Sequence, residues 1–320
     1  ILPSHIDSGS PNLYMEESMQ SIKSILVIID PTVERDCVID RAKIIAKSTN
    51  AKVELFINYN NSLTDQTYSF EGEDDNFIKN QSKLFHEHFE QLLSHQVAEF
   101  TKDGIEVSYL LKEESHLAEA IINHAIEFKP DLVLKSTHHH SAIQRSLVTN
   151  TDWRLIRKCP STLLLVKPNE WQANGSVVTA VDPLHAKAAQ TSLDHQLLTY
   201  TEMFAGFLKQ PACVFHCYFP FVNSMFPLGS ESTEHLLTVR DKHQIKLNEL
   251  LADYNIDPDN VHLTHGELVS TLITYLKSTE ANILVIGALS RNFLERAIVG
   301  NTAEKILDDC PCDVLVVKPT

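Results

Sequence analysis

The chain has 320 residues, of which 43% are hydrophobic and 22% charged, a globular composition long enough for two ordinary domains. Its formal net charge of −15 argues against nucleic acid and anionic membrane surfaces as partners, because the long-range field repels phosphate groups. No apolar run approaches the ~20 residues of a membrane span, and no basic segment followed by an apolar block opens the chain, which favours a cytoplasmic protein.

The first residues and the cysteines add little to the fold. Residues 1–20 show neither helical nor strand periodicity, so we expect a leader outside the folded domains. Met19 is typical of a natural start, which leaves the origin of residues 1–18 open. The six cysteines lack the paired spacing of a structural zinc site, and we expect them to be reduced packing residues.

Strand and helix patterns then alternate along the chain. The expected strands of the first half are 25–30, 52–59, 106–112, 132–136 and 162–166, and the expected helices are 37–49, 77–102, 116–128 and 151–158. In the long helix, Phe85, Phe89, Leu92 and Leu93 fall on one stripe, which predicts a face turned to the core.

The second half repeats the first. "SLVTNTDWRLIRKCPSTLLLVKP" (146–168) and "AIVGNTAEKILDDCPCDVLVVKP" (297–319) align with a constant offset of 151 residues, and both halves begin with a strand ending in Asp-Pro. This indicates a tandem duplication. We expect a first copy at 21–168, a linker at 169–175 and a second copy at 176–320.

The strands are apolar throughout, which indicates burial on both faces of a parallel, doubly wound sheet with a ligand site at the carboxyl ends of its strands. The short linker keeps the copies close, so we predict an intramolecular pseudo-dimer. The strongly apolar last strand of each copy is the predicted pairing edge. Whether the chain also forms a homodimer stays open.

One loop of the second copy contains the candidate ligand-binding residues. Gly287 stands where a strand becomes a loop, Ser290 follows, and Gly300 opens "GNTAE" before a helix. Both glycines permit close backbone approach and positive φ. Asn301 and Glu304 form an approximate capping box, so a helix should begin at Asn301 or Thr302.

The amides at that helix start predict an anion site, with side chains that can donate to phosphate. Asp182, at the tip of the first strand, should face the same crevice and could contact a ribose hydroxyl or a metal ion. The alternative is purely structural: Gly300 serves a turn, Asn301 caps a helix and Asp182 starts a turn with Pro183.

Together, the Asp-Pro strand ends, the G-x-x-S-x9-G-N-T loop and the "VLVVKP" final strand resemble the universal stress protein family, in its tandem-domain type. The resemblance covers about Ser21 to Pro319. It implies two Rossmann-like domains of the adenine nucleotide alpha hydrolase-like type, each a five-stranded, mostly parallel sheet flanked by helices. It also implies ATP or AMP as ligand, with or without Mg²⁺.

Carried over by position, the resemblance implies that Asp182 contacts the ribose or Mg²⁺ and that Gly287 and Ser290 lie along the phosphates. Gly300, Asn301 and Thr302 would cradle the phosphate tail. Ser290 departs from the pattern, which has a second glycine there.

The first copy has lost this pattern. Lys135, His138 and Thr149 replace Gly287, Ser290 and Gly300, and the helix start keeps Asn150 and Thr151 but has Trp153 in place of Glu304, which predicts a lost capping box. We expect this degenerate site, which retains Asp30, not to bind a nucleotide in the same manner. His138, His139 and His140 suit a metal, an anion or merely an exposed loop, and Lys135 is a further candidate anion contact.

Three functions stay open on the sequence. The first is a stress-response protein that binds an adenine nucleotide in the second copy and acts on protein partners, with slow ATP hydrolysis at most. The second is a sensor or carrier of another small ligand, such as a nucleotide-sugar or acyl-bearing metabolite, held beside an apolar wall at 215–228. The third is a ligand-free scaffold.

Overall fold

A computed structural model describes residues 22–33, 36–59, 75–137, 149–184, 188–218, 232–288 and 301–318. The first copy contains β1 (Ser24–Ile28), α1 (Cys37–Thr49), β2 (Lys52–Tyr59), α2 (Asp75–Lys102), β3 (Val107–Glu113), α3 (Leu117–Phe128), β4 (Leu132–Ser136), α4 (Asn150–Lys158) and β5 (Thr162–Val166). The second contains β6 (Ser176–Ala180), α5 (Ala188–Leu208), β7 (Ala212–Tyr218), α6 (Ser232–Leu251), η1 (Pro258–Asn260), β8 (Val261–His265), α7 (Leu268–Ser278), β9 (Ala281–Gly287), α9 (Asn301–Asp309) and β10 (Asp313–Val317). These elements confirm the predicted order.

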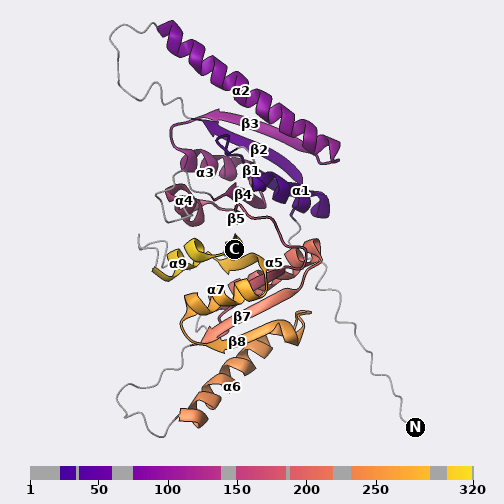
Figure 1. Cartoon of the computed structure of the whole chain (residues 1–320), viewed down its shortest axis with the longest axis vertical. Helices are drawn as coiled ribbons and strands as arrows, with labels where there is room; N and C mark the ends of the chain where they lie inside the picture. Colours follow the sequence, from indigo (N-terminus) through magenta and orange to yellow (C-terminus); the bar gives the residue numbers. More distant parts are fainter. Residues whose placement is uncertain are drawn as a thin grey trace, which may run out of the picture.

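The ten strands form one continuous sheet in the order β3-β2-β1-β4-β5-β10-β9-β6-β7-β8. All neighbouring strands run parallel except β5 and β10, which pair antiparallel with Leu164 opposite Leu315. The predicted pairing edge is therefore confirmed, and Figure 1 shows the two copies joined end to end across it. Because this one pair is antiparallel, the carboxyl ends of the two sets of parallel strands lie at opposite edges of the sheet.

Two large hydrophobic cores lie on the two faces of this sheet and extend through both copies, and a smaller third cluster with Val214 and Leu247 lies under α6. One lies under α1, α2 and α5, with Ile45, Phe100 and Phe204 fully buried. The other lies under α3, α4, α7 and α9, with Leu155 and Leu272 buried in it. Since strands β5 and β10 are buried along their whole length, the copies share their cores as one folded unit.

The long helix α2 follows the predicted stripe only in part. Leu93 is fully buried, and Phe89 and Leu92 pack against the core. Phe85, however, is 44% exposed. The prediction is wrong at this position because Phe85 contacts Phe89, with ring centroids 6.4 Å apart, while its ring stays largely open to solvent.

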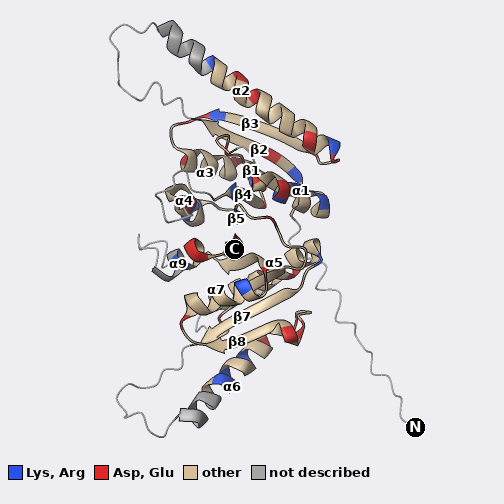
Figure 2. Cartoon of the chain, viewed as in Figure 1, with Lys and Arg blue, Asp and Glu red and all other residues tan. Residues whose placement is uncertain are grey.

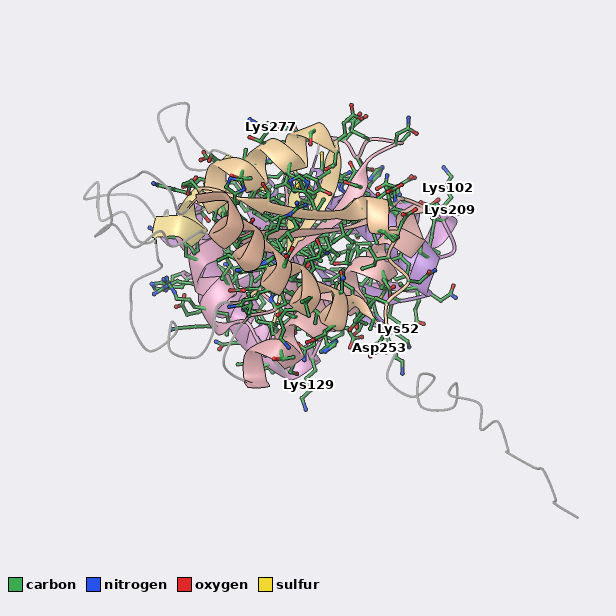
Figure 3. The ribbon with its side chains drawn as sticks, turned by 90° about the horizontal axis from the view of Figure 1, so that it is seen from below. Lys52, Lys102, Lys129, Lys209, Asp253 and Lys277 are labelled. Atoms are coloured by element: carbon green, nitrogen blue, oxygen red, sulfur yellow. The ribbon has the colours of Figure 1, made fainter. Side chains whose placement is uncertain are left out.

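Charged residues cover the outside of the molecule. Figure 2 shows acidic and basic residues interspersed along the ribbons of α1 and α2, and Lys47 of α1 pairs with Asp103, the residue after α2, at 2.9 Å. Figure 3 shows the molecule from below, turned by 90° from the view of Figure 1, and the labelled charged residues lie at its periphery. They are Lys52, Lys102, Lys129, Lys209, Asp253 and Lys277. None of the helices in the described part of the chain has the length and apolar content that crossing a membrane requires.

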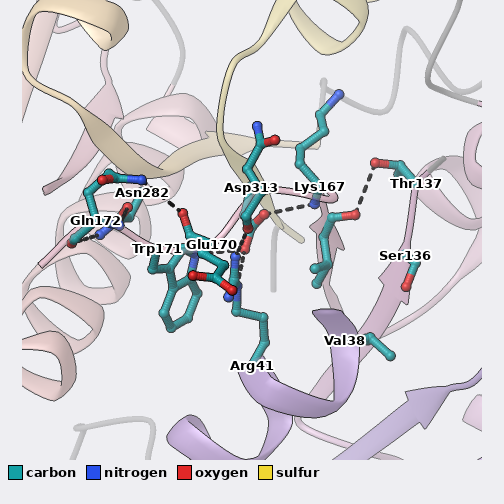
Figure 4. Close-up of polar contacts among 12 residues, drawn as sticks. Val38, Arg41, Ser136, Thr137, Lys167, Glu170, Trp171, Gln172, Asn282 and Asp313 are labelled. Carbon is teal, nitrogen blue, oxygen red and sulfur yellow. Dashed lines mark hydrogen bonds and ion pairs between the residues drawn. The ribbon is translucent and has the colours of Figure 1, made fainter. Parts of the chain in front are cut away.

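The joint between the copies contains a buried ion pair. Asp313, at the start of β10, is 2% exposed and accepts hydrogen bonds from Arg41 Nε (2.9 Å), the Lys167 backbone N–H (2.8 Å) and Trp171 Nε1 (2.8 Å). The Arg41 guanidinium also donates to the Asn169 carbonyl and lies over the Trp171 ring. Figure 4 shows these groups converging from α1, the linker and β10.

Two lysines, 151 residues apart, reinforce the joint reciprocally. Lys167 Nζ donates to the carbonyl of Leu307 at 2.9 Å, in the last turn of α9. Lys318 Nζ donates to the carbonyls of Leu155 and Ile156, in the last turn of α4. Each copy thus supplies a cation to the negative end of a helix in the other copy.

Candidate functional site

The predicted site of the second copy lies where β6, β9 and α9 meet. Asp182 follows β6, Gly287 ends β9, and the Ala288 N–H donates to the Val317 carbonyl of β10 at 2.7 Å. Helix α9 begins at Asn301, as predicted. Ser290 and Gly300 lie outside the described residues, and so do the side chains of Asn301, Thr302 and Glu304, so the capping box expected at α9 stays a prediction.

Gly287 is required by packing. A Cβ at this position would lie 2.5 Å from Cδ2 of Leu193 on α5, well inside van der Waals contact. Leu193 therefore approaches the Gly287 backbone closely, and the approach of a phosphate to Gly287 stays a prediction. Gly287 does not use the positive φ that glycine permits; Gly104 and Gly266 do so in the described part of the chain.

Two carboxyl groups lie together at the end of β6. Asp182 accepts from the Leu184 N–H at 3.4 Å, as a residue starting a turn does, and its own backbone bonds to the carboxyl group of Asp194 on α5. Burial, with a smaller contribution from the nearby charge of Asp182, raises the pKa of Asp194 to about 7. This edge of the site is thus acidic, and the charge of Asp194 changes near neutral pH.

A pair of histidines extends the site along β7. His216, 2% exposed, places Nδ1 2.9 Å from the Val181 carbonyl and Nε2 2.7 Å from Nδ1 of His243 on α6. Since a carbonyl only accepts, Nδ1 of His216 carries the hydrogen. Burial lowers the pKa of His243, while the charge of Asp182 acts in the opposite direction.

Sequence reasoning missed Asp194, His216 and His243. Two of them had a weak signal in the pattern: Asp194 stands among the core-facing residues of α5, and His216 lies inside the apolar run of β7. A polar residue on a buried face needs a partner, and here the partners are at the candidate site. His243 stands in a polar helix and had no such signal.

The apolar wall expected at 215–228 is not supported at its first residue. Phe215 is fully buried and packs against His262 and Tyr275, with ring centroids 5.7 and 5.5 Å away. It belongs to the core under α7. Residues 219–231 lie outside the described part of the chain.

The first copy differs from its predicted state in two ways. Thr149 and Asp152 form a complete capping box at the start of α4, with the Thr149 N–H donating to Asp152 Oδ2 at 2.7 Å. The predicted loss of the capping box is therefore wrong, because Thr149 replaces the glycine as cap and Asp152, not residue 153, completes the box. Asn150 and Thr151 open the helix.

Lys135 is also bonded internally. Its ammonium pairs with Asp152 Oδ1 at 2.8 Å and donates to the Ser136 carbonyl, and both side chains of the pair are buried. This contradicts the expectation that Lys135 serves as an anion contact. His138, His139 and His140 lie outside the described residues.

The Asp30 carboxylate bonds locally, because its Oδ1 accepts a hydrogen bond from the Thr32 N–H at 2.8 Å. Beside it, a hollow of about 280 Å³ is lined by Asp36, Ser136, Thr137 and the chain that leaves β5. Within the described residues, no three His, Cys, Asp or Glu side chains are grouped so as to hold a metal ion.

A duplicated α/β fold with parallel strands and helices on both faces of the sheet defines a Rossmann-like class of protein. The model of the universal stress protein family matches residues 21–167 and 185–318. The chain belongs to the universal stress protein family.

Relatives of similar length support this assignment. Universal stress protein E of Photorhabdus laumondii is 28% identical over 305 residues, covering 94% of this chain and 96% of that protein. Universal stress protein E of Escherichia coli K12 is 25% identical over 94% of this chain and 95% of that protein.

Solved structures show the same tandem fold. A functionally unknown protein from Pseudomonas aeruginosa PAO1 superposes with a TM-score of 0.73 at 23% identity, covering 94% of both chains. A universal stress protein from Archaeoglobus fulgidus superposes with a TM-score of 0.63 at 14% identity, covering 94% of this chain and all of that one.

Proposed function

We propose that this protein binds one adenine nucleotide, ATP or AMP, in its second copy and responds by changing its contacts with protein partners. The ligand would lie across the carboxyl ends of β6 and β9, between Asp182 and the start of α9. Domain boundaries at 21–168 and 176–320, with the linker at 169–175, are part of this proposal.

One contrast between the copies carries the proposal. In the first copy, the Lys135–Asp152 ion pair joins the end of β4 to the first turn of α4. The residues 151 positions later are Ile286 and Ala303. Neither side chain can form such an ion pair, so the bridge that joins the strand end to the helix start in the first copy has no counterpart between these two positions, which supports a phosphate site in the second copy.

The local charges suggest how a nucleotide would be oriented. Backbone amides at the start of α9, with Gly300, Asn301 and Thr302, suit the phosphates. Asp182 beside Asp194 is acidic and would repel phosphate, so it suits a ribose hydroxyl or a Mg²⁺ that also takes phosphate oxygens as ligands. Gly287 and Ser290 would lie between these two ends.

Binding, and not turnover, is the proposed mechanism. A nucleotide shifts the protein between two conformations only by as much as it prefers one of them. Hydrolysis would need a positioned water and base, so the proposal includes slow ATP hydrolysis at most.

The duplication supplies matched controls for a binding test. Calorimetric titration with ATP, ADP and AMP, each with and without Mg²⁺, should give one site per chain. Asn301→Ala and Asp182→Ala should each weaken binding about tenfold or more, which is the loss of roughly one charge-assisted hydrogen bond. Asn150→Ala and Asp30→Ala, the matching changes in the first copy, should leave the affinity unchanged.

Two results would overturn the proposal. Absence of binding at millimolar nucleotide would remove the adenine nucleotide and direct attention to another small ligand or to a ligand-free scaffold. Weakening by Asn150→Ala but not by Asn301→Ala would move the site to the first copy.

A further inference from the structure

Two buried thiols face each other in the turn between α9 and β10. Cys310 and Cys312 are 2% and 4% exposed, and their Sγ atoms are 3.5 Å apart, in hydrogen-bonding contact. Both are free thiols. Burial alone explains why a cysteine stands at either position, but it does not explain two thiols in direct contact.

The corresponding turn of the first copy has one cysteine and no second thiol, so it serves as a comparison. There the sequence is Cys159-Pro160-Ser161, 151 residues before Cys310-Pro311-Cys312. Burial raises the pKa of the Cys159 thiol. In the second copy the hydrogen bond from Cys312 lowers the pKa of Cys310, and that of Cys312 is raised. One thiol of the pair is therefore favoured as the thiolate.

A cation lies next to the pair. Lys167 is 2% exposed, and the charge of its ammonium stabilises the Cys310 thiolate while Nζ stays hydrogen-bonded to Leu307. A thiolate beside a cation is the reactive form of cysteine.

Cys312 of the pair also lines a cavity, and Cys310 lies behind it in contact with the Cys312 sulfur. A cavity of about 600 Å³ is lined by Pro311, Cys312 and Asp313 on one side and by the linker and Arg41 on the other. It is large enough for a small oxidant to reach the turn.

We propose that Cys310 and Cys312 are a redox-sensitive dithiol, which hydrogen peroxide converts to an intramolecular disulfide. The Cys310 thiolate attacks one peroxide oxygen, the O–O bond breaks, and Cys310 becomes a sulfenic acid with release of hydroxide. The Cys312 sulfur then attacks the Cys310 sulfur, the S–O bond breaks, and hydroxide leaves, taking up the Cys312 proton as water. Both sulfurs are oxidised, and the peroxide is reduced to two waters.

Oxidation of the pair would change the contacts at the joint between the copies. The Pro311 carbonyl accepts from Asn169 Nδ2 at 3.2 Å, and the residue after Cys312 is Asp313, the acceptor of the buried joint. Closing the disulfide draws Cys312 toward Cys310, since bonded sulfurs lie ~2.05 Å apart. The Asp313 carboxylate moves with it, against Arg41 and Trp171.

The test is peroxide titration of the reduced full-length chain, followed by blocking of free thiols and peptide mapping. We expect a disulfide between Cys310 and Cys312 that dithiothreitol reverses. In Cys312→Ser the reaction should stop at a Cys310 sulfenic acid, trapped by dimedone. In Cys310→Ser the turn should stay unoxidised, as should Cys159 in the wild type. Lys167→Gln should slow the reaction roughly tenfold, since less thiolate is present.

The joint has its own readout. In a Trp153→Phe background, Trp171 is the remaining tryptophan of the chain. Its emission should shift on oxidation and return on reduction, and it should not shift in Cys312→Ser. Ser161→Cys is the gain-of-function control: it should give the first copy a second oxidisable pair.

Two results would overturn the proposal, and a third would overturn only its link to the joint. The first is both thiols remaining free after peroxide has oxidised the half-buried Cys37. The second is a Cys310 thiol that peroxide oxidises at equal rates in Lys167→Gln and in Cys312→Ser, together with the absence of a Cys310–Cys312 disulfide in the oxidised wild type. The third is a disulfide that leaves Trp171 unchanged, which would remove the link to the joint. None depends on nucleotide binding.

Discussion

The substitution Asp313→Asn tests whether the joint between the two copies depends on a buried charge. Asparagine has the same shape but only one acceptor oxygen, whereas the Asp313 carboxylate accepts from Arg41, Lys167 and Trp171. The Arg41 side chain is 4% exposed, so its charge would stay buried without a counter-ion. Removing one partner of a buried pair costs about 3–5 kcal/mol.

Urea unfolding followed by circular dichroism and by tryptophan emission measures this loss. The control is the double substitution Arg41→Met with Asp313→Leu, which removes both charges. Because the desolvation cost of both ions disappears with them, it should lose less stability than Asp313→Asn alone. A loss below about 1 kcal/mol for Asp313→Asn, or a larger loss for the double variant, would show that the pair behaves like an exposed one and would refute this reasoning.

Other sites give further predictions. The pKa of Asp194 is raised to about 7 in the folded state, so the folded protein holds a proton that the unfolded chain releases near its ordinary value of 3.8. Stability should therefore fall as pH rises between these values, and Asp194→Asn should be more stable than wild type at pH 8, by on the order of 1–3 kcal/mol, but not at pH 3; equal stability at both pH values would contradict this. Thr149→Ala removes the cap of α4 and should cost about 1 kcal/mol in urea unfolding, with Thr151→Ala, inside the helix, as the milder control. Gly287→Ala should cost about 1–3 kcal/mol by overpacking, and a background Leu193→Ala, which removes the opposing methyl groups, should reduce that cost; an unchanged cost would contradict the packing explanation.

The backbone plan was predictable from the sequence because it depends on repeated local signals. Continuous apolar runs identified the buried strands, and the bounds of β2, β4 and β5 agree with the predicted ranges. The constant offset between the two copies identified the duplication, and the apolar last strands identified the β5–β10 pairing. These signals repeat along the chain, so an error at one residue is corrected by its neighbours.

The chemistry of single positions was less predictable, because it depends on partners far apart in the sequence. Arg41 and Asp313 are 272 residues apart. Asp152 was overlooked because the alignment directed attention to position 153, where the second copy has its glutamate. Lys135 was predicted to bind an anion because nothing in its own segment shows that Asp152 is within 2.8 Å.

The antiparallel pairing of β5 and β10 explains why the two copies could diverge. It places the start of β10 beside the end of β5, so the joint lies at the edge where the strands of the first copy end. The hollow of the first copy and the cavity of the joint share Pro168 and Glu170 of the chain leaving β5. A ligand in the first copy would therefore press on the joint itself. The Lys135–Asp152 pair closes that copy from within, while the carboxyl ends of the strands of the second copy lie at the opposite edge of the sheet.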